Sequence, residues 1–246
     1  MKAKHLLAGA AALLANSAAM AGSLTGNVGA VSDYMFRGLD RSIAGAAVQG
    51  GVDYNFDMGA YTGLWVTNNS IAGGNEADVY GGYGMKLGPF SLDAGVIYYG
   101  YTEDTESLTN PGLSRNTDYA EVYVGGGVGP INLKVFYTNA FGSDLGGAVS
   151  GDPDKNELLY ATASATLTLT KTISFTPQVG FTSGDGAKDA FGDEYADYSL
   201  TATKTLDNDM SVSLAVVGSD LRNFNGITDN KDAPKFVIGF KKSFKI

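Results

Sequence analysis

The sequence of 246 residues contains no cysteine and a single histidine, His5. Without cysteine the chain can form neither a disulfide bond nor a thiolate metal site, and it has no thiol nucleophile. Charged residues make up only 17% of the chain, and 26 acidic residues outnumber 17 basic ones. No nucleic acid is therefore expected as a partner, because such binding needs a basic surface. The apolar content of 44% excludes a disordered chain.

The N-terminus has the pattern of a secretory signal peptide. Two lysines precede an apolar run over residues 6–14, and Ala19-Met20-Ala21 forms a cleavage site of small residues. The alternative is an N-terminal membrane anchor, which would need about 20 apolar residues. We therefore expect residues 1–21 to be removed and residues 22–246 to form the mature protein.

Removal of this peptide takes away His5 and two lysines, so the net charge changes from −9 to −11. A mature chain without histidine or cysteine excludes a Ser-His-Asp triad, histidine-ligated zinc and a histidine base. The motif Asp152-x-Asp154-x-Asn156 opens like a calcium loop, but Glu157 stands where such a loop needs glycine. We expect no enzymatic activity, no catalytic residues, no metal and no cofactor.

The mature chain shows the alternation of β-strands rather than the period of helices. No segment approaches 18 consecutive apolar residues, which excludes transmembrane helices. Between residues 131 and 138, for example, apolar side chains at odd positions alternate with Asn132, Lys134 and Thr138. We predict twelve strands, at about residues 23–34, 46–56, 60–68, 77–87, 90–101, 119–128, 131–139, 157–169, 172–182, 195–205, 210–218 and 234–244.

The connections between these strands alternate between short and long. Gly88-Pro89 and Gly129-Pro130 suit type II′ hairpin turns, in which glycine takes the positive φ and proline follows. The long connections are rich in Gly, Asn, Asp and Ser, as solvated loops are. They span about residues 35–45, 69–76, 102–118, 140–156, 183–194 and 219–233.

Short turns at one end, long loops at the other and an even strand number predict an all-β fold: a transmembrane, antiparallel, up-and-down β-barrel of the outer membrane. The alternative is a secreted β-sandwich, whose core would need more leucine, isoleucine and phenylalanine.

The long loops hold 16 of the 26 acids and 7 of the 15 cations of the mature chain. An acidic mouth would enrich cations, although exposed loops also carry charge for solubility alone.

The polar faces of the strands and the start of the first long loop supply the candidate pore-lining residues. Lys86 and Asp93 flank the turn at Gly88-Pro89 with similar parity, and we expect them to pair. The lumen either forms a water-filled path or is filled by salt bridges, and a strand number of twelve is compatible with both. The candidates are Asn27, Asp33, Arg37, Gln49, Asp53, Asp78, Tyr80, Lys86, Asp93, Glu121, Tyr123, Lys134, Tyr160, Gln178 and Asp197.

The stretch from Leu24 to Gly38, LTGNVGAVSDYMFRG, resembles the opening of the TorF-type porin family of Gram-negative bacteria. Ala47–Tyr54 and Gly59–Trp65 resemble the next two blocks of that family in order. The resemblance covers about residues 24–68. It implies an outer-membrane barrel with a channel role, and it carries no substrate and no functional residues.

Two charged residues, Asp33 and Arg37, fall where the first strand enters the first long loop. They either belong to a constriction near the mouth or form a structural ion pair, with Gly38 supplying a turn.

The chain ends Phe244-Lys245-Ile246, whereas barrels of the resembled class usually end in an aromatic residue. Recognition by the barrel-assembly machinery is then expected to be weaker or shifted.

These patterns predict a passive channel for small hydrophilic solutes or ions, with cations favoured by the acidic loops. The alternative is a closed barrel whose loops serve adhesion or surface structure. The expected partners are outer-membrane lipid and lipopolysaccharide, the barrel-assembly machinery, and the solutes themselves.

Overall fold

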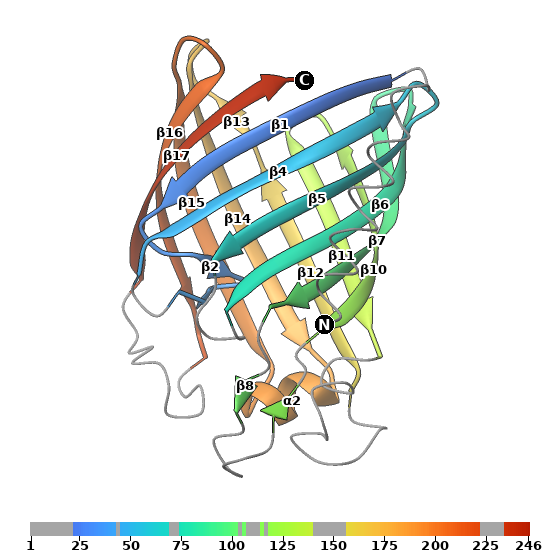
Figure 1. The fold of residues 1–246 in the computed structure, drawn as a ribbon, viewed down its shortest axis with the longest axis vertical. Coiled ribbons are helices and arrows are strands. Elements are labelled where there is room, and N and C mark those ends of the chain that lie inside the picture. Colours follow the sequence, from blue (N-terminus) through green and yellow to red (C-terminus); the bar gives the residue numbers. More distant parts are fainter. Residues whose placement is uncertain are drawn as a thin grey trace.

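In the computed structural model, twelve antiparallel strands of the described part of the chain close into a barrel (Figure 1). Strand β1 (Gly22–Val31) pairs on one side with β4 (Ala47–Phe56) and on the other with β17 (Lys235–Lys245), and this second pairing closes the ring. The predicted fold class is confirmed. The structure describes residues 22–42, 45–68, 74–102, 105–106, 114–115, 118–139, 156–221 and 234–246.

The other wall strands follow the predicted spans closely. The first strand ends at Val31 rather than at residue 34, and Thr166 divides the predicted strand 157–169 into β12 and β13. The expected signal peptide and most residues of four long loops lie outside the described residues. The wall strands are β5 (Ala60–Asn68), β6 (Asn75–Leu87), β7 (Phe90–Tyr101), β10 (Tyr119–Val128), β11 (Ile131–Thr138), β12 (Leu158–Ala165), β13 (Leu167–Thr168), β14 (Ile173–Ser183), β15 (Tyr195–Thr205) and β16 (Met210–Ser219).

The connections between strands contain a few short elements. None of the described helices is long and apolar enough to cross a membrane. Two expected solvated loops contain regular structure instead, because the first long loop forms a hairpin and the loop 183–194 forms a helix. The short elements are β2 (Met35–Phe36), β3 (Leu39–Asp40), β8 (Thr105–Glu106), β9 (Ser114–Arg115) and α2 (Asp185–Phe191).

The short turns adopt the backbone conformations that their residues favour. Gly88 and Gly129 have φ values of 60° and 57°, which confirms the positive φ predicted for them. Asn208 and Asp209 also have positive φ, 59° and 57°, as the two central residues of a type I′ hairpin turn do. These turns lie at the upper end of the barrel in Figure 1, and the short elements β2, β8 and α2 lie toward the lower end.

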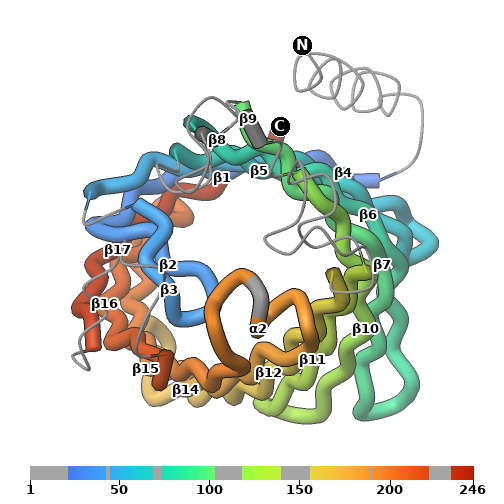
Figure 2. Tube along the Cα trace, turned by 90° about the horizontal axis from the view of Figure 1, so that it is seen from below, coloured from blue at the N-terminus to red at the C-terminus, as the bar shows by residue number. Residues whose placement is uncertain are grey.

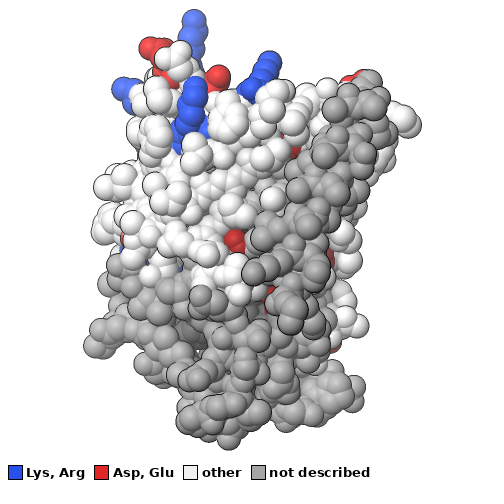
Figure 3. Space-filling model, viewed as in Figure 1, with Lys and Arg blue, Asp and Glu red and all other residues white. Residues whose placement is uncertain are grey.

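The two faces of the wall differ in polarity. Large apolar side chains cover the outer face, and Val179 and Phe236 expose 59% and 68% of their surface there. Ile246 shares this outward direction, as predicted from its parity. Where Figure 3 leaves the wall uncovered, few acidic atoms are visible on it, and the visible lysine and arginine side chains gather at the short-turn end.

Tyrosine rings of the inner face lie over glycines of the neighbouring strand. Tyr80 is the register partner of Gly63, and a Cβ atom on that glycine would come within 2.5 Å of the ring. Tyr123 covers Gly95 in the same way. An aromatic ring over a cross-strand glycine gives that glycine the packing that it lacks by itself. This arrangement gives part of the 34 glycines and 14 tyrosines a shared structural role.

Adjacent residues of β14 allow a matched test of the two faces. We expect Val179→Arg to lower the free energy of unfolding in lipid vesicles by about 2–4 kcal/mol, because it places a charge against lipid. The side chain at position 178 points into the lumen, so Gln178→Arg should change the free energy of unfolding little. Urea titration of both variants measures the difference, and equal losses would contradict the assignment of faces.

Candidate functional site

The first long loop folds into the barrel instead of outward into solvent. Its strands β2 and β3 pair through Phe36 with Leu39 and Met35 with Asp40, and we call residues 35–40 the lumen hairpin. The tip residues Arg37 and Gly38 both have positive φ, 50° and 76°, as in a type I′ turn. Figure 2 shows β2, β3 and helix α2 inside the ring of strands.

An ion pair to the opposite wall holds the tip of the lumen hairpin. The guanidinium of Arg37 donates to Oε2 of Glu121 in β10 at 2.6 Å, and only 7% and 0% of the two side chains are exposed. The guanidinium also lies 4.4 Å from the ring centre of Tyr160 and 5.4 Å from that of Phe136. Burial opposes the positive charge, but the Glu121 carboxylate outweighs it and raises the pKa of Arg37 above its ordinary value.

The residues flanking the hairpin form hydrogen bonds and an ion pair with side chains of other strands. The Tyr34 hydroxyl donates to Oε1 of Glu76 in β6 at 2.9 Å. Arg41 donates to the hydroxyl of Tyr101 in β7 at 3.2 Å. Asp40 forms an ion pair with Lys235 at the start of β17. The loop is therefore anchored on several sides of the lumen.

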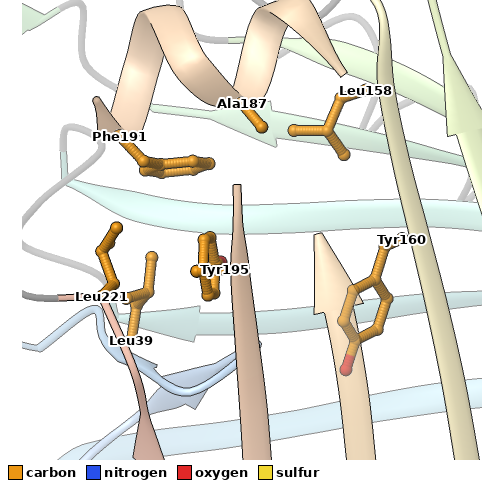
Figure 4. Packing of buried hydrophobic residues seen from close by; sticks show 7 residues of the cluster. All are labelled: Leu39, Leu158, Tyr160, Ala187, Phe191, Tyr195 and Leu221. Atoms are coloured by element: carbon orange, nitrogen blue, oxygen red, sulfur yellow. The ribbon is translucent and has the colours of Figure 1, made fainter. Parts of the chain in front are cut away.

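The tip also packs tightly against the wall and against α2. A Cβ atom at Gly38 would lie 2.6 Å from Cβ of Asp197 and 2.9 Å from the carbonyl oxygen of Gly218, so this contact requires glycine. Leu39 enters a buried apolar cluster with residues of β12, α2 and β15 (Figure 4). The hairpin and α2 thus pack together within the long-loop half of the lumen. The cluster consists of Leu39, Leu158, Tyr160, Ala187, Phe191, Tyr195 and Leu221.

Toward the short turns the lumen contains a cavity of about 310 Å³ that is lined by both polar and apolar groups. Nζ of Lys134 forms an ion pair with Asp93 at 2.8 Å and lies 4.0 Å from the ring centre of Tyr123. The Tyr61 hydroxyl donates to the same aspartate at 2.6 Å. A larger apolar groove of about 560 Å³ involves Leu92 and other outward side chains, and it belongs to the outer face. The cavity is lined by Ser91, Asp93, Gly125, Gly126, Asn132, Leu133, Lys134, Phe136, Thr162, Ser164 and Gln178.

The candidate residues that lie in strands occupy inward register positions. Their role in lining a conducting path stays a prediction. The structure brings several of them together: Tyr80 with Asp53, Lys134 with Asp93 and Tyr123, and Tyr160 with Asp197. The inward positions are Asn27, Gln49, Asp53, Asp78, Tyr80, Lys86, Asp93, Glu121, Tyr123, Lys134, Tyr160, Gln178 and Asp197.

The expected ion pair between Lys86 and Asp93 is wrong, and so is the alternative in which Asp33 pairs with Arg37. Asp93 pairs with Lys134 of β11 rather than with Lys86. The intervening residue on β10 is Gly125, and its missing side chain lets the lysine reach across that strand. Asp33 does not pair with Arg37, which binds Glu121; its carboxylate instead lies 4.0 Å from Nζ of Lys235.

Sequence reasoning missed several residues of the site. Trp65 and Glu76 share the inward parity of the predicted lumen residues, so strand alternation could have found them. Tyr34 is the last residue of the first predicted strand, but β1 ends at Val31. Arg41 lies in the first long loop, where no periodicity indicates a direction. Within the part of the chain that the structure describes, no group of three or more acidic or histidine side chains could hold a metal ion.

The chain belongs to a known protein family. The family described as "Bacterial protein of unknown function (Gcw_chp)" matches residues 15–244. No curated protein matches this sequence significantly. The TorF-type resemblance stays a prediction, since the matching family has another description.

Solved porins share the fold at low sequence identity. The KdgM porin is 11% identical, with a TM-score of 0.53 over 89% of this chain and 99% of its own. The NanC porin is 14% identical, with a TM-score of 0.53 over 91% of this chain and 100% of its own. A KdgM porin in complex with disordered oligogalacturonate has a TM-score of 0.51, at 11% identity over 90% and 99% of the two chains. This likeness establishes a porin-like barrel fold.

The Arg37–Glu121 pair can be tested by a double-mutant cycle. Arg37→Met should cost about 3–5 kcal/mol of unfolding free energy, because it leaves the Glu121 carboxylate buried without its partner. The double variant with Glu121→Gln should recover most of this loss. Release of the hairpin should also expose the bond after Arg41 to trypsin, which mass spectrometry of the fragments detects.

The control for this cycle is Lys188→Met in α2, which removes exposed ion pairs to Asp185 and Glu194. It should change neither stability nor cleavage noticeably. A loss in the double variant equal to the sum of the two single losses would show that the pair is not coupled.

Proposed function

We propose that this member of the Gcw_chp family is an outer-membrane channel for passive diffusion of small hydrophilic solutes and ions, with a preference for cations. The observation that carries the proposal is the polarity of the closed wall, which is apolar outside and lined inside by charged and hydroxyl side chains. Such a wall suits lipid on one side and water on the other. Outer-membrane lipid, lipopolysaccharide and the barrel-assembly machinery are the proposed partners.

The proposed cation preference follows from the charges of the inner wall. Asp53, Asp78, Glu121 and Asp197 project inward from four different strands, in addition to the paired Asp93. Arg37 of the hairpin neutralises Glu121, and Lys134 neutralises Asp93. Among the candidate residues of the wall, Asp53, Asp78 and Asp197 then remain against Lys86. Rings of carboxylates favour cations in narrow pores. Oligogalacturonate, which is bound in a KdgM structure, carries carboxylates and is disfavoured by an acidic wall.

A second candidate function is a closed barrel with a structural or adhesive role for its loops. The packing of the lumen hairpin and α2 against the wall favours this alternative, because both fill space that a wide pore would need. Under the first proposal the same packing makes the hairpin a constriction that limits solute size. The two functions differ in whether the folded barrel conducts.

Planar-bilayer recording distinguishes these functions. We expect discrete conductance steps from refolded protein, and a reversal potential in a KCl gradient that indicates K⁺ preference and weakens as the salt concentration rises. Heat-modifiable gel migration of the same sample verifies that the barrel is folded. Folded protein without steps would support the closed barrel, and conduction without K⁺ preference would refute the electrostatic part of the proposal.

A further inference from the structure

The lumen cavity near the short turns is built on three rows of register partners that cross the wall from β7 to β14. The row nearest the turns carries hydroxyl and amide side chains, the next carries the ion pair of the cavity, and the third is aromatic. We call them the polar, charged and aromatic rows. The polar row is Ser91, Gly127, Asn132, Ser164 and Gln178, the charged row is Asp93, Gly125, Lys134 and Thr162, and the aromatic row is Tyr123, Phe136 and Tyr160.

Two inward glycines of β10 make room for the cavity. A Cβ atom at Gly127 would lie 2.5 Å from Oδ1 of Asn132 and 3.0 Å from Oγ of Ser91, so these two polar atoms converge on one point. A Cβ atom at Gly125 would lie 3.2 Å from Cγ of Lys134. Without side chains at the two glycines, the polar groups of the neighbouring strands face a shared space.

The hydroxyl and amide groups of the polar row are not used within the described part of the chain. No hydrogen bond to another described residue occupies the side chains of Ser91, Asn132, Ser164 and Gln178. These side chains are half-buried or exposed at inward positions, so a solute in the lumen can reach them. Hydroxyl and amide groups both donate and accept hydrogen bonds. A ligand whose own groups donate and accept, such as a polyol, matches this row.

The charges of the cavity balance each other. Oδ2 of Asp93 binds Nζ of Lys134, and its Oδ1 accepts from the Tyr61 hydroxyl, so both carboxylate oxygens already have a donor. Asp93 and Lys134 are the only charged residues among the described residues that line the cavity. The ammonium has further N–H donors, and 32% of the lysine side chain is exposed. The cavity therefore offers a donor to a hydroxyl group without favouring a charged ligand.

Phe136 of the aromatic row supplies an apolar surface to the cavity. Its ring centre lies 5.6 Å from Nζ of Lys134 and 5.4 Å from the guanidinium of Arg37, so the ring adjoins both the cavity and the hairpin tip. The C–H groups of a sugar ring form an apolar face that packs against an aromatic ring, while its hydroxyl groups project around the edge.

The size of the cavity limits the ligand to a small molecule. Its volume of about 310 Å³ lies at the lower end of the range of about 300–1,000 Å³ for small-molecule sites. This volume suits a single sugar ring rather than an oligomer.

We propose that the cavity binds a neutral, polyhydroxylated solute of the size of a monosaccharide. The polar row and Lys134 bind its hydroxyl groups, and Phe136 packs against its C–H face. This inference rests on the proposed function and deepens it, since it names a class of solute for which the channel has a binding site. The acidic residues elsewhere on the wall do not oppose such a ligand, because it carries no charge.

Saturation-transfer difference NMR of folded protein in detergent micelles tests this site, because the method detects weakly bound ligands through their C–H protons. The probes are glucose, glucuronate and protonated glucosamine, which share a ring and differ in charge. Titration gives a dissociation constant for each. We expect glucose to bind at least several-fold more tightly than either charged sugar. Absence of saturable glucose binding, or equal or tighter binding of a charged sugar, would overturn the proposal.

A matched pair of variants locates the binding to the cavity. Gln178→Leu removes an amide of the polar row and should weaken glucose binding by about three- to tenfold, as expected for the loss of a hydrogen bond. Gln49→Leu makes the same change at an inward position of β4 that does not line the cavity, and should leave binding unchanged. Equal effects of the two variants would refute the location. If Gln178→Leu does not fold, the ligand series with the wild-type protein still decides the question.

A charge variant tests why the ligand is neutral. Lys134→Met leaves the Asp93 carboxylate without its cation, so the preference should change from glucose to protonated glucosamine. An unchanged order of the three sugars in this variant would refute the role of the ion pair in selecting a neutral ligand.

The binding measurement does not depend on conduction. Saturable glucose binding without current in bilayers would retain the site and refute the channel. Current without saturable glucose binding would retain the channel and refute the site.

Discussion

Closure of the wall by β1 and β17 is the constraint on which the rest of the molecule depends. A membrane interior offers no water to backbone N–H and C=O groups, so a spanning sheet must pair every strand on both sides. The register between β1 and β17, from Thr25 opposite Lys245 to Val31 opposite Gly239, supplies that pairing. Once the ring is closed, alternate side chains must face lipid and lumen, and the two faces acquire opposite polarity.

Side chains, the lumen hairpin and helix α2 fill much of the interior of the closed wall. Tyrosine rings over glycines, as in Tyr80 over Gly63, line the wall without protruding far into the lumen. The hairpin then brings Arg37 into contact with Glu121. A buried ion pair contributes little net stability, because the cost of desolvation offsets much of the attraction. In any other position of the hairpin, however, the guanidinium of Arg37 would lose its carboxylate partner. The pair therefore selects one position of the loop.

Local patterns were sufficient to predict the twelve strands, the short turns and the inward direction of the candidate residues that lie in strands. Period-2 alternation placed Asp53, Glu121 and Asp197 on one face because it reflects the geometry of each strand alone. The partners of these side chains were not predictable in this way. Arg37 and Glu121 lie 84 residues apart, and Lys134 reaches Asp93 only because Gly125 stands between them. The inward fold of the first loop was missed because polar residues suit a wet lumen as well as solvent.

By itself, the sequence determined that the chain has neither cysteine nor, in the expected mature form, histidine, and that its strands carry one polar and one apolar face. These properties depend on composition and on neighbours two residues apart. Only the tertiary structure decided which polar side chains meet, that a loop occupies the lumen, and where hydroxyl and amide groups converge on a cavity. Closing the ring brings distant strands around a shared interior, and contacts across that interior depend on register and side-chain length rather than on any local pattern.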